Sequence, residues 1–181
     1  MRNLFVILLL LAVAACGGRP EPVSEADVEK AQAALRPFKQ ELTTALTGAM
    51  EQGPEHALDV CQLRAPEIAS ELSKEGLVMG RTGHRLRNPA NAPAPWMKPL
   101  LAAYQDDPQA RAPRAVRLDD GGFGYVEPIY VKPLCLTCHG KTLSPSVREK
   151  IATLYPDDQA IGFEEGDFRG LFWMTMPPAG P

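Results

Sequence analysis

The residues with the clearest chemical role lie in one short segment, Cys135-Leu136-Thr137-Cys138-His139. Two cysteines three positions apart, followed at once by a histidine, form the attachment motif of c-type haem. The two thiols can add to the two vinyl groups of haem as thioethers, and the adjacent imidazole can then coordinate the iron. The whole sequence has only three histidines, so a histidine directly after the second cysteine would rarely occur by chance. The motif predicts one haem c, bound by Cys135, Cys138 and His139.

Other chemistry uses the same residue types, and three alternatives stay open. Together with Cys61, the motif would supply a Cys₃His set for zinc, in a non-redox binding domain. A thioredoxin-like dithiol is a second alternative, although a proline before the motif and a glycine after it do not match the strand and helix that usually flank one. The third is a plain disulfide between Cys135 and Cys138 with a bystander histidine.

The start of the chain predicts export. After Arg2, residues 4–13 form an apolar run of signal-peptide length, too short to span a bilayer. Small residues then lead to Cys16, which resembles the lipidated cysteine of a bacterial lipoprotein; an ordinary secretory signal is the alternative. We expect a signal peptide at 1–15, a lipidated linker at 16–23 and one domain at 24–178, anchored to a membrane on its periplasmic face.

The composition excludes several classes of protein. Hydrophobic residues make up 45% and charged residues 23%, which excludes wholesale disorder and a polytopic membrane protein. The net charge is −3 and no long run of lysine and arginine occurs, so we expect no nucleic-acid partner.

The elements that must position the motif follow from periodicity and turn residues. Apolar residues at helical spacing predict a long first helix from Ser24, which Pro37 should kink or divide and which is a candidate for homodimerisation. A second helix follows to about residue 74, and Pro66 should break it. Further along we expect a strand at 78–86, a helix at 96–104, a hairpin at 115–118 and 123–131, a helix at 145–155 and a strand at 168–176. Short links favour antiparallel pairing, so the fold class is α+β, a small antiparallel sheet with helices on one side.

Cys61 lies on the apolar face of the second predicted helix, with Leu58, Ala65 and Ile68. One interpretation is a buried structural thiol, which is common for cysteine. Against it, an unpaired thiol outside the cytoplasm is open to oxidation, and the second face of a haem needs a ligand.

Four stretches of sequence carry a joint resemblance: Ala57-Leu58-Asp59-Val60-Cys61 with Ala65-Pro66, Gly80-Arg81-Thr82 with Arg87-Asn88-Pro89-Ala90-Asn91-Ala92-Pro93, Pro133 through Gly140, and Tyr155-Pro156-Asp157-Asp158 with Gly166-Asp167-Phe168-Arg169-Gly170. They resemble a c-type haem family with a PAS-like fold, long catalogued as a domain of unknown function. The resemblance extends over residues 24–177.

The resemblance implies a PAS-like domain whose haem iron is ligated by His139 on one face and by the Cys61 thiolate on the other. The sequence departs from the family pattern at Gly83, His84 and Met97. As sixth ligand, the alternatives to Cys61 are His84, Met79, Met97 or an open position.

These ligands predict a function. A thiolate stabilises Fe(III) and lowers the potential, and a six-coordinate iron offers no position for peroxide, so we expect no enzyme unless the sixth site opens to peroxidase-like chemistry. Redox or gas sensing through a separate membrane signalling partner is the leading hypothesis, and low-potential electron transfer to a redox partner is the alternative.

Three arginines are candidates for binding the haem propionates: Arg81, Arg85 and Arg87.

Overall fold

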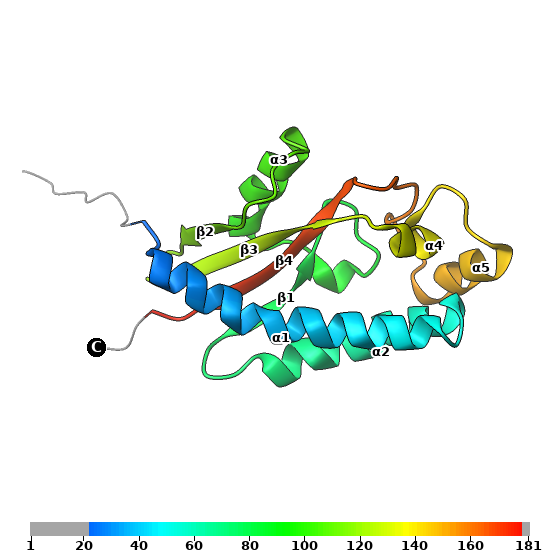
Figure 1. Cartoon of the computed structure of the whole chain (residues 1–181), viewed down its shortest axis with the longest axis horizontal. Coiled ribbons are helices and arrows are strands. Elements are labelled where there is room, and N and C mark those ends of the chain that lie inside the picture. Colours follow the sequence, from blue (N-terminus) through cyan, green and yellow to red (C-terminus); the bar gives the residue numbers. More distant parts are fainter. Residues whose placement is uncertain (1–21, 179–181) are drawn as a thin grey trace, which may run out of the picture.

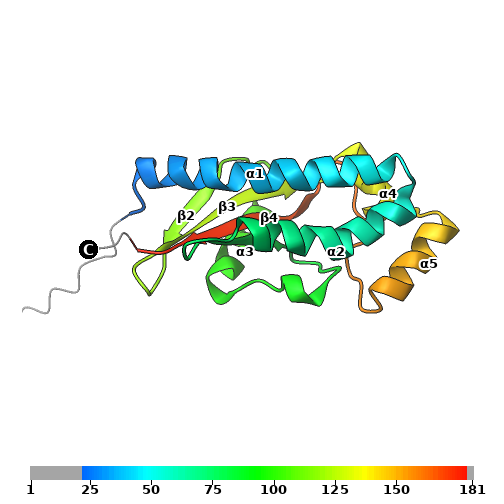
Figure 2. The same ribbon diagram turned by 90° about the horizontal axis from the view of Figure 1, so that it is seen from below.

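Two long helices begin the described part of the chain, which in this computed structural model comprises residues 22–178. Helix α1 spans Glu25–Met50 and α2 spans Pro54–Leu72, and they lie side by side (Figures 1 and 2). The side chain of Ser24 accepts a hydrogen bond from the backbone N–H of Asp27 at 3.1 Å, which satisfies a free donor at the start of α1. The signal peptide and lipidated Cys16 of the sequence prediction lie outside the described residues.

The two prolines do not divide these helices. Pro37 lies inside α1 and Pro66 inside α2, and each helix is one continuous element, so no second segment starts at Pro37 and the break expected at Pro66 is wrong. Both proline rings are on the exposed side of their helix, where water can satisfy the carbonyl that loses its partner. On the opposite side of α1, buried Leu35 and Phe38 flank the proline, and this packing maintains the helix through it.

The sheet has four antiparallel strands in the order β1-β4-β3-β2. Their bounds are β1 Val78–Thr82, β2 Arg114–Arg117, β3 Phe123–Tyr130 and β4 Phe168–Met176. The strand expected to reach residue 86 ends at Thr82, because the segment after it bonds to a distant loop instead: the carbonyl of Leu86 accepts from the N–H of Gln159 at 2.8 Å. The C-terminal strand β4 lies between β1 and β3, which the sequence did not predict.

Alternate residues of β4 pack on opposite faces of the sheet. Met174 is buried with Leu35 and Phe38 of α1, whereas Leu171 is buried with Leu101 of α3, which spans Lys98–Asp106. Helices therefore cover both faces, so the expectation of helices on one side is corrected. The α+β class, with a small antiparallel sheet flanked by helices and consistent with a PAS-like domain, is confirmed.

Short helices complete the domain. They are η1 Pro89–Asn91, η2 Pro95–Met97, η3 Pro133–Cys135, α4 Leu136–His139 and α5 Pro145–Leu154. Helices α4 and α5 lie beside the α1–α2 connection, at the end of the molecule opposite residues 22 and 178 (Figures 1 and 2). Among the described residues, no helix combines the length and apolar character that a membrane span requires.

Candidate haem-binding site

The cysteine-histidine motif forms one tight helical turn immediately after β3. Cys135 ends η3, Cys138 and His139 lie on α4, and the N–H of Gly140 closes the turn on the carbonyl of Leu136 at 2.9 Å. A Cβ on Gly140 would lie 2.5 Å from that carbonyl oxygen, so this position needs glycine. Because residues three apart share one side of a helical turn, the two thiols are presented to the same neighbouring space. Both cysteines are half-buried and free of disulfides.

The imidazole of His139 is oriented by a backbone carbonyl. Its Nδ1 lies 2.6 Å from the carbonyl oxygen of Ala160, which can only accept, so Nδ1 carries the proton and Nε2 keeps its lone pair. Burial, with the nearby charges of Arg87 and Arg169, holds the pKa of His139 well below its usual range. A neutral imidazole with one nitrogen bonded to a carbonyl and the other free is the form that ligates a metal.

Arg87 joins the motif to the loop that holds this carbonyl. Its guanidinium pairs with both carboxylate oxygens of Asp158, at 3.2 and 3.1 Å, and donates to the carbonyls of Cys138 at 2.6 Å and Ala160 at 3.3 Å. The side chains of the pair are only 8% and 6% exposed. Arg87 therefore has partners inside the protein, among them the same carbonyl that orients His139.

Cys61 lies on α2, which packs against both α4 and α5. One turn before it, Leu58 is buried in a cluster that includes Cys138, together with Val147 and Ile151 of α5. Burial raises the pKa of Cys138, and the charge of Cys61 raises it further against the opposing effect of Arg87. The structure thus brings Cys61 near the motif.

Tyr155 marks the same neighbourhood. It follows α5 and is 5% exposed. Burial raises the pKa of its hydroxyl, and the charge of Cys61 adds to this effect. The side chain of Cys61 is itself partly buried.

The alternative sixth ligands lie in different places. His84 stacks on Phe168 with ring centroids 5.8 Å apart, its Nδ1 is buried without a hydrogen-bond partner, and burial lowers its pKa, with help from the charges of Arg169 and Arg85. Met79 is buried in the core with residues of α1. Met97 is buried at the end of η2.

Phe163 is surrounded by the groups of the site. The rings of His84 and His139 lie 6.0 and 6.3 Å from its ring centroid, and the guanidinium carbons of Arg85 and Arg169 lie 4.2 and 5.3 Å from it. Arg169 was missed by the sequence prediction. Its signal was present, since the residue belongs to the Gly166-to-Gly170 stretch, but nothing local shows that β4 carries it to the motif.

The residues present fit a haem of the c type. Two thiols lie on one turn, a neutral imidazole offers Nε2, and a further thiol lies on the neighbouring helix. For zinc the geometry is different: in residues 22–178, no three His, Cys, Asp or Glu side chains are grouped closely enough to hold a metal ion. The zinc alternative therefore lacks a preassembled ligand set.

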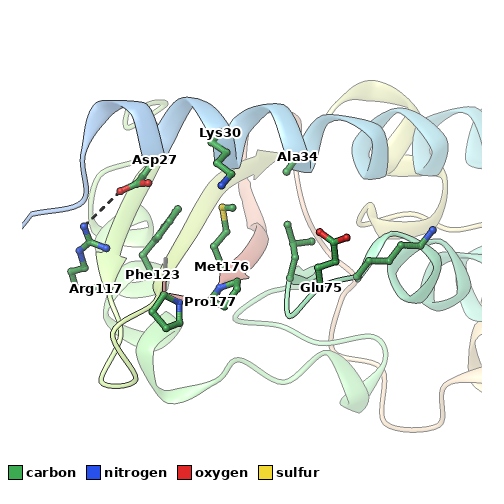
Figure 3. Close-up of a pocket in the computed structure, with 11 residues that line it drawn as sticks. Asp27, Lys30, Ala34, Glu75, Arg117, Phe123, Met176 and Pro177 are labelled. Carbon is green, nitrogen blue, oxygen red and sulfur yellow. Dashed lines mark ion pairs between the residues drawn. The ribbon is translucent and has the colours of Figure 1, made fainter. Parts of the chain in front are cut away.

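A separate pocket of about 480 Å³ lies between α1, the α2–β1 connection and the ends of β2, β3 and β4 (Figure 3). Asp27 and Arg117 form an ion pair of 3.6 Å at its rim, and Phe123 and Met176 supply apolar walls. None of the predicted site residues lines this pocket.

The comparisons with known proteins agree with this fold. The profile of the Tll0287-like family matches residues 21–177. Among solved structures, the crystal structure of the cyanobacterial heme-protein Tll0287 matches with a TM-score of 0.64 and 23% identity, covering 88% of this chain and 99% of that one. At this identity the structural match shows the fold alone. Among curated proteins there is no match. Since the family profile spans nearly the whole described domain, the resemblance is confirmed and the chain belongs to the Tll0287-like family.

Proposed function

We propose that this protein is an exported haem c protein that senses redox state or a gaseous ligand. Cys135 and Cys138 would attach one haem as thioethers, and His139 and the Cys61 thiolate would ligate its iron. One observation carries the proposal: the Ala160 carbonyl holds Nδ1 of His139 at 2.6 Å and so directs Nε2 away as a ligand, beside the helix that carries Cys61. That the related Tll0287 is described as a heme-protein supports it.

When bound, haem would supply a one-electron Fe(III)/Fe(II) couple. The protein's residues would bias that couple toward Fe(III), because a thiolate donates electron density and the Nδ1–H···O bond makes His139 a stronger donor. With both axial positions taken by protein ligands, no site is left for peroxide, and we propose no enzymatic reaction.

The placement of Cys61 supports a switch over a simple carrier. The motif and Cys61 lie on different elements, whose side chains meet in the Leu58–Cys138 cluster. The 2.7 Å ion pair between Asp59 and Lys150 also joins α2 to α5. Fe(II) binds a thiolate less well, and protonation removes it as a ligand. Release of Cys61 would remove one connection between α2 and α4, so the state of the iron could alter how α2 packs.

Helix α1 provides a path from this end of the domain to the other. It packs along α2 and its 26 residues span about 39 Å at 1.5 Å per residue. Its first turn lies at the opposite end from α4 and α5 (Figure 2). With lipidation at Cys16, the haem would be held away from the membrane and α1 would carry the change toward a membrane partner or a second copy of the chain.

One observation favours electron transfer as a second candidate. Leu134 is 44% exposed and precedes Cys135 directly. An exposed apolar side chain beside the attachment site is suited to a weak contact with a redox partner.

Absorption spectra of protein matured with c-type haem machinery would test the proposal. Wild type, Cys61→Ala and a control on the same helix, Ser70→Ala, would be compared in both oxidation states. We expect a thiolate-type ferric spectrum that only Cys61→Ala abolishes. If reduction removes this signature and carbon monoxide then binds, sensing is supported; six-coordination by protein ligands in both states would support electron transfer. Wild-type protein without covalent haem would refute both.

A further inference from the structure

Within the part of the chain that the structure describes, three arginines beside the candidate site form no ion pair with a carboxylate. Arg81 lies on β1, Arg85 follows it, and Arg169 lies on β4. Within residues 22–178, the ion pairs include Arg87 with Asp158 but none that joins these three to an acid. Charged groups that leave water without a partner are costly, so such a surplus indicates a place for an anion.

These like charges are held together. Arg85 and Arg169 both lie over the ring of Phe163, and Nη1 of Arg169 donates to the backbone carbonyl of Arg85 at 3.1 Å. Burial and the positive charges of Arg81 and Arg87 together lower the pKa of Arg169 to about 10. A structure that brings cations together in this way needs a compensating negative charge.

Two glycines make the close approach possible. A Cβ on Gly83 would lie 2.8 Å from the carbonyl oxygen of Arg169 and 2.9 Å from its Nη1. A Cβ on Gly170, where φ is +153°, would lie 2.1 Å from the carbonyl oxygen of Thr82. The ends of β1 and β4 therefore converge only because both positions lack side chains, and this convergence places Arg169 beside Arg85.

A buried imidazole nitrogen borders the same cluster. The Nδ1 of His84 is buried and has no hydrogen-bond partner. Its ring meets the edge of Phe163, as does the ring of His139. The cluster thus lies next to the candidate axial ligand and includes an unsatisfied polar atom.

We propose that Arg169, together with Arg81 and Arg85, forms a carboxylate-binding site, and that its ligands are the two propionate groups of the haem. Guanidinium pairs with carboxylate through two parallel hydrogen bonds. Three unpaired cations are sufficient for two carboxylates. Arg87 is not part of this set, because Asp158 already neutralises it. The inference rests on the proposed haem site; a free small carboxylate is the other source of the same chemistry.

The test is the midpoint potential of the haem-loaded protein. We would compare wild type with Arg169→Gln and Arg169→Lys, using Arg36→Gln, an exposed arginine of α1, as the control. Loss of a nearby positive charge favours Fe(III), so Arg169→Gln should shift the Fe(III)/Fe(II) ratio about tenfold, or about 59 mV for one electron. Arg169→Lys should recover most of this shift, and the control should show none. If Arg169→Gln does not fold, Arg81→Gln provides the same test from β1.

Three outcomes would contradict the inference in different ways. An unchanged potential in both glutamine variants, with haem covalently bound, would mean that these arginines do not face the propionates, while the haem site would stand. A rise in the melting temperature of haem-loaded wild type with citrate, absent in Arg169→Gln, would assign the site to a free carboxylate. Wild-type protein without covalent haem would refute the proposed function itself.

Discussion

Replacing Asp158 by asparagine would leave the guanidinium of Arg87 without its carboxylate in the interior. Asparagine has nearly the same shape and keeps an oxygen that can accept from the N–H of Ala160, a bond that Asp158 Oδ1 makes at 2.9 Å. The change therefore removes the charge and preserves the turn. Arg87 would keep the carbonyls of Cys138 and Ala160 as partners.

The size of the effect follows from burial. The two side chains are 8% and 6% exposed, so water screens them little. Removing one partner of a buried ion pair costs about 3–5 kcal/mol, and the two remaining carbonyl partners place this case near the lower end, at about 3 kcal/mol. With a urea slope of about 2 kcal/mol/M, the unfolding midpoint should fall by about 1.5 M.

Urea unfolding of the haem-loaded protein at neutral pH would measure this change. The matched control is Asp157→Asn, because Asp157 is the exposed neighbour and carries the same charge. The control should change the free energy of unfolding by no more than about 0.5 kcal/mol. Equal losses in the two variants would refute the argument, since net charge rather than the buried pair would then determine the effect.

Further predictions concern the core and the strand ends. Gly83→Ala should destabilise the protein by about 1–3 kcal/mol, because its Cβ would lie 2.8 Å from the Arg169 carbonyl oxygen. Gly48→Ala in α1, where the added Cβ meets open space, should stabilise it by about 0.5–1 kcal/mol. Thermal unfolding of the two variants should therefore show melting temperatures shifted in opposite directions. Burial and the carboxylate of Glu127 raise the pKa of Tyr125, so above about pH 10 the unfolded chain loses this proton first and stability falls as pH rises. Tyr125→Phe should cost about 1 kcal/mol at neutral pH, because it loses the 3.1 Å hydrogen bond to Glu127. Between neutral and high pH, urea unfolding should show a smaller loss of stability in this variant than in wild type. Equal losses in the two proteins would contradict the prediction.

Local patterns were sufficient for the elements and for the motif. The strand at Phe168–Met176 was predicted with the bounds that the structure has, and the long first helix began where Ser24 indicated. These features depend on side-chain period and on capping, which neighbouring residues determine. The helix breaks expected at Pro37 and Pro66 do not occur, because the effect of a proline depends on whether it lies on the exposed or the buried side of its helix.

Distant contacts could not be predicted in the same way. Arg87 was a candidate for binding propionates, and its partner Asp158 lies 71 positions away. Arg169 was not chosen at all, because its place beside Arg85 depends on β4 lying against β1. Strand order is set by which faces bury the most apolar surface, a property of the whole chain.

The reactive residues of this protein are therefore recognisable from short segments of sequence, whereas their orientation and protonation depend on how those segments pack. Residue type and spacing alone identify Cys135, Cys138 and His139 as one reactive unit. Whether His139 is neutral and which nitrogen is free depends on the Ala160 carbonyl, and whether Cys61 lies near the motif depends on α2 packing against α4. Covalent chemistry needs only neighbours along the chain, whereas orientation, charge and burial arise when segments far apart in sequence share one low-dielectric interior.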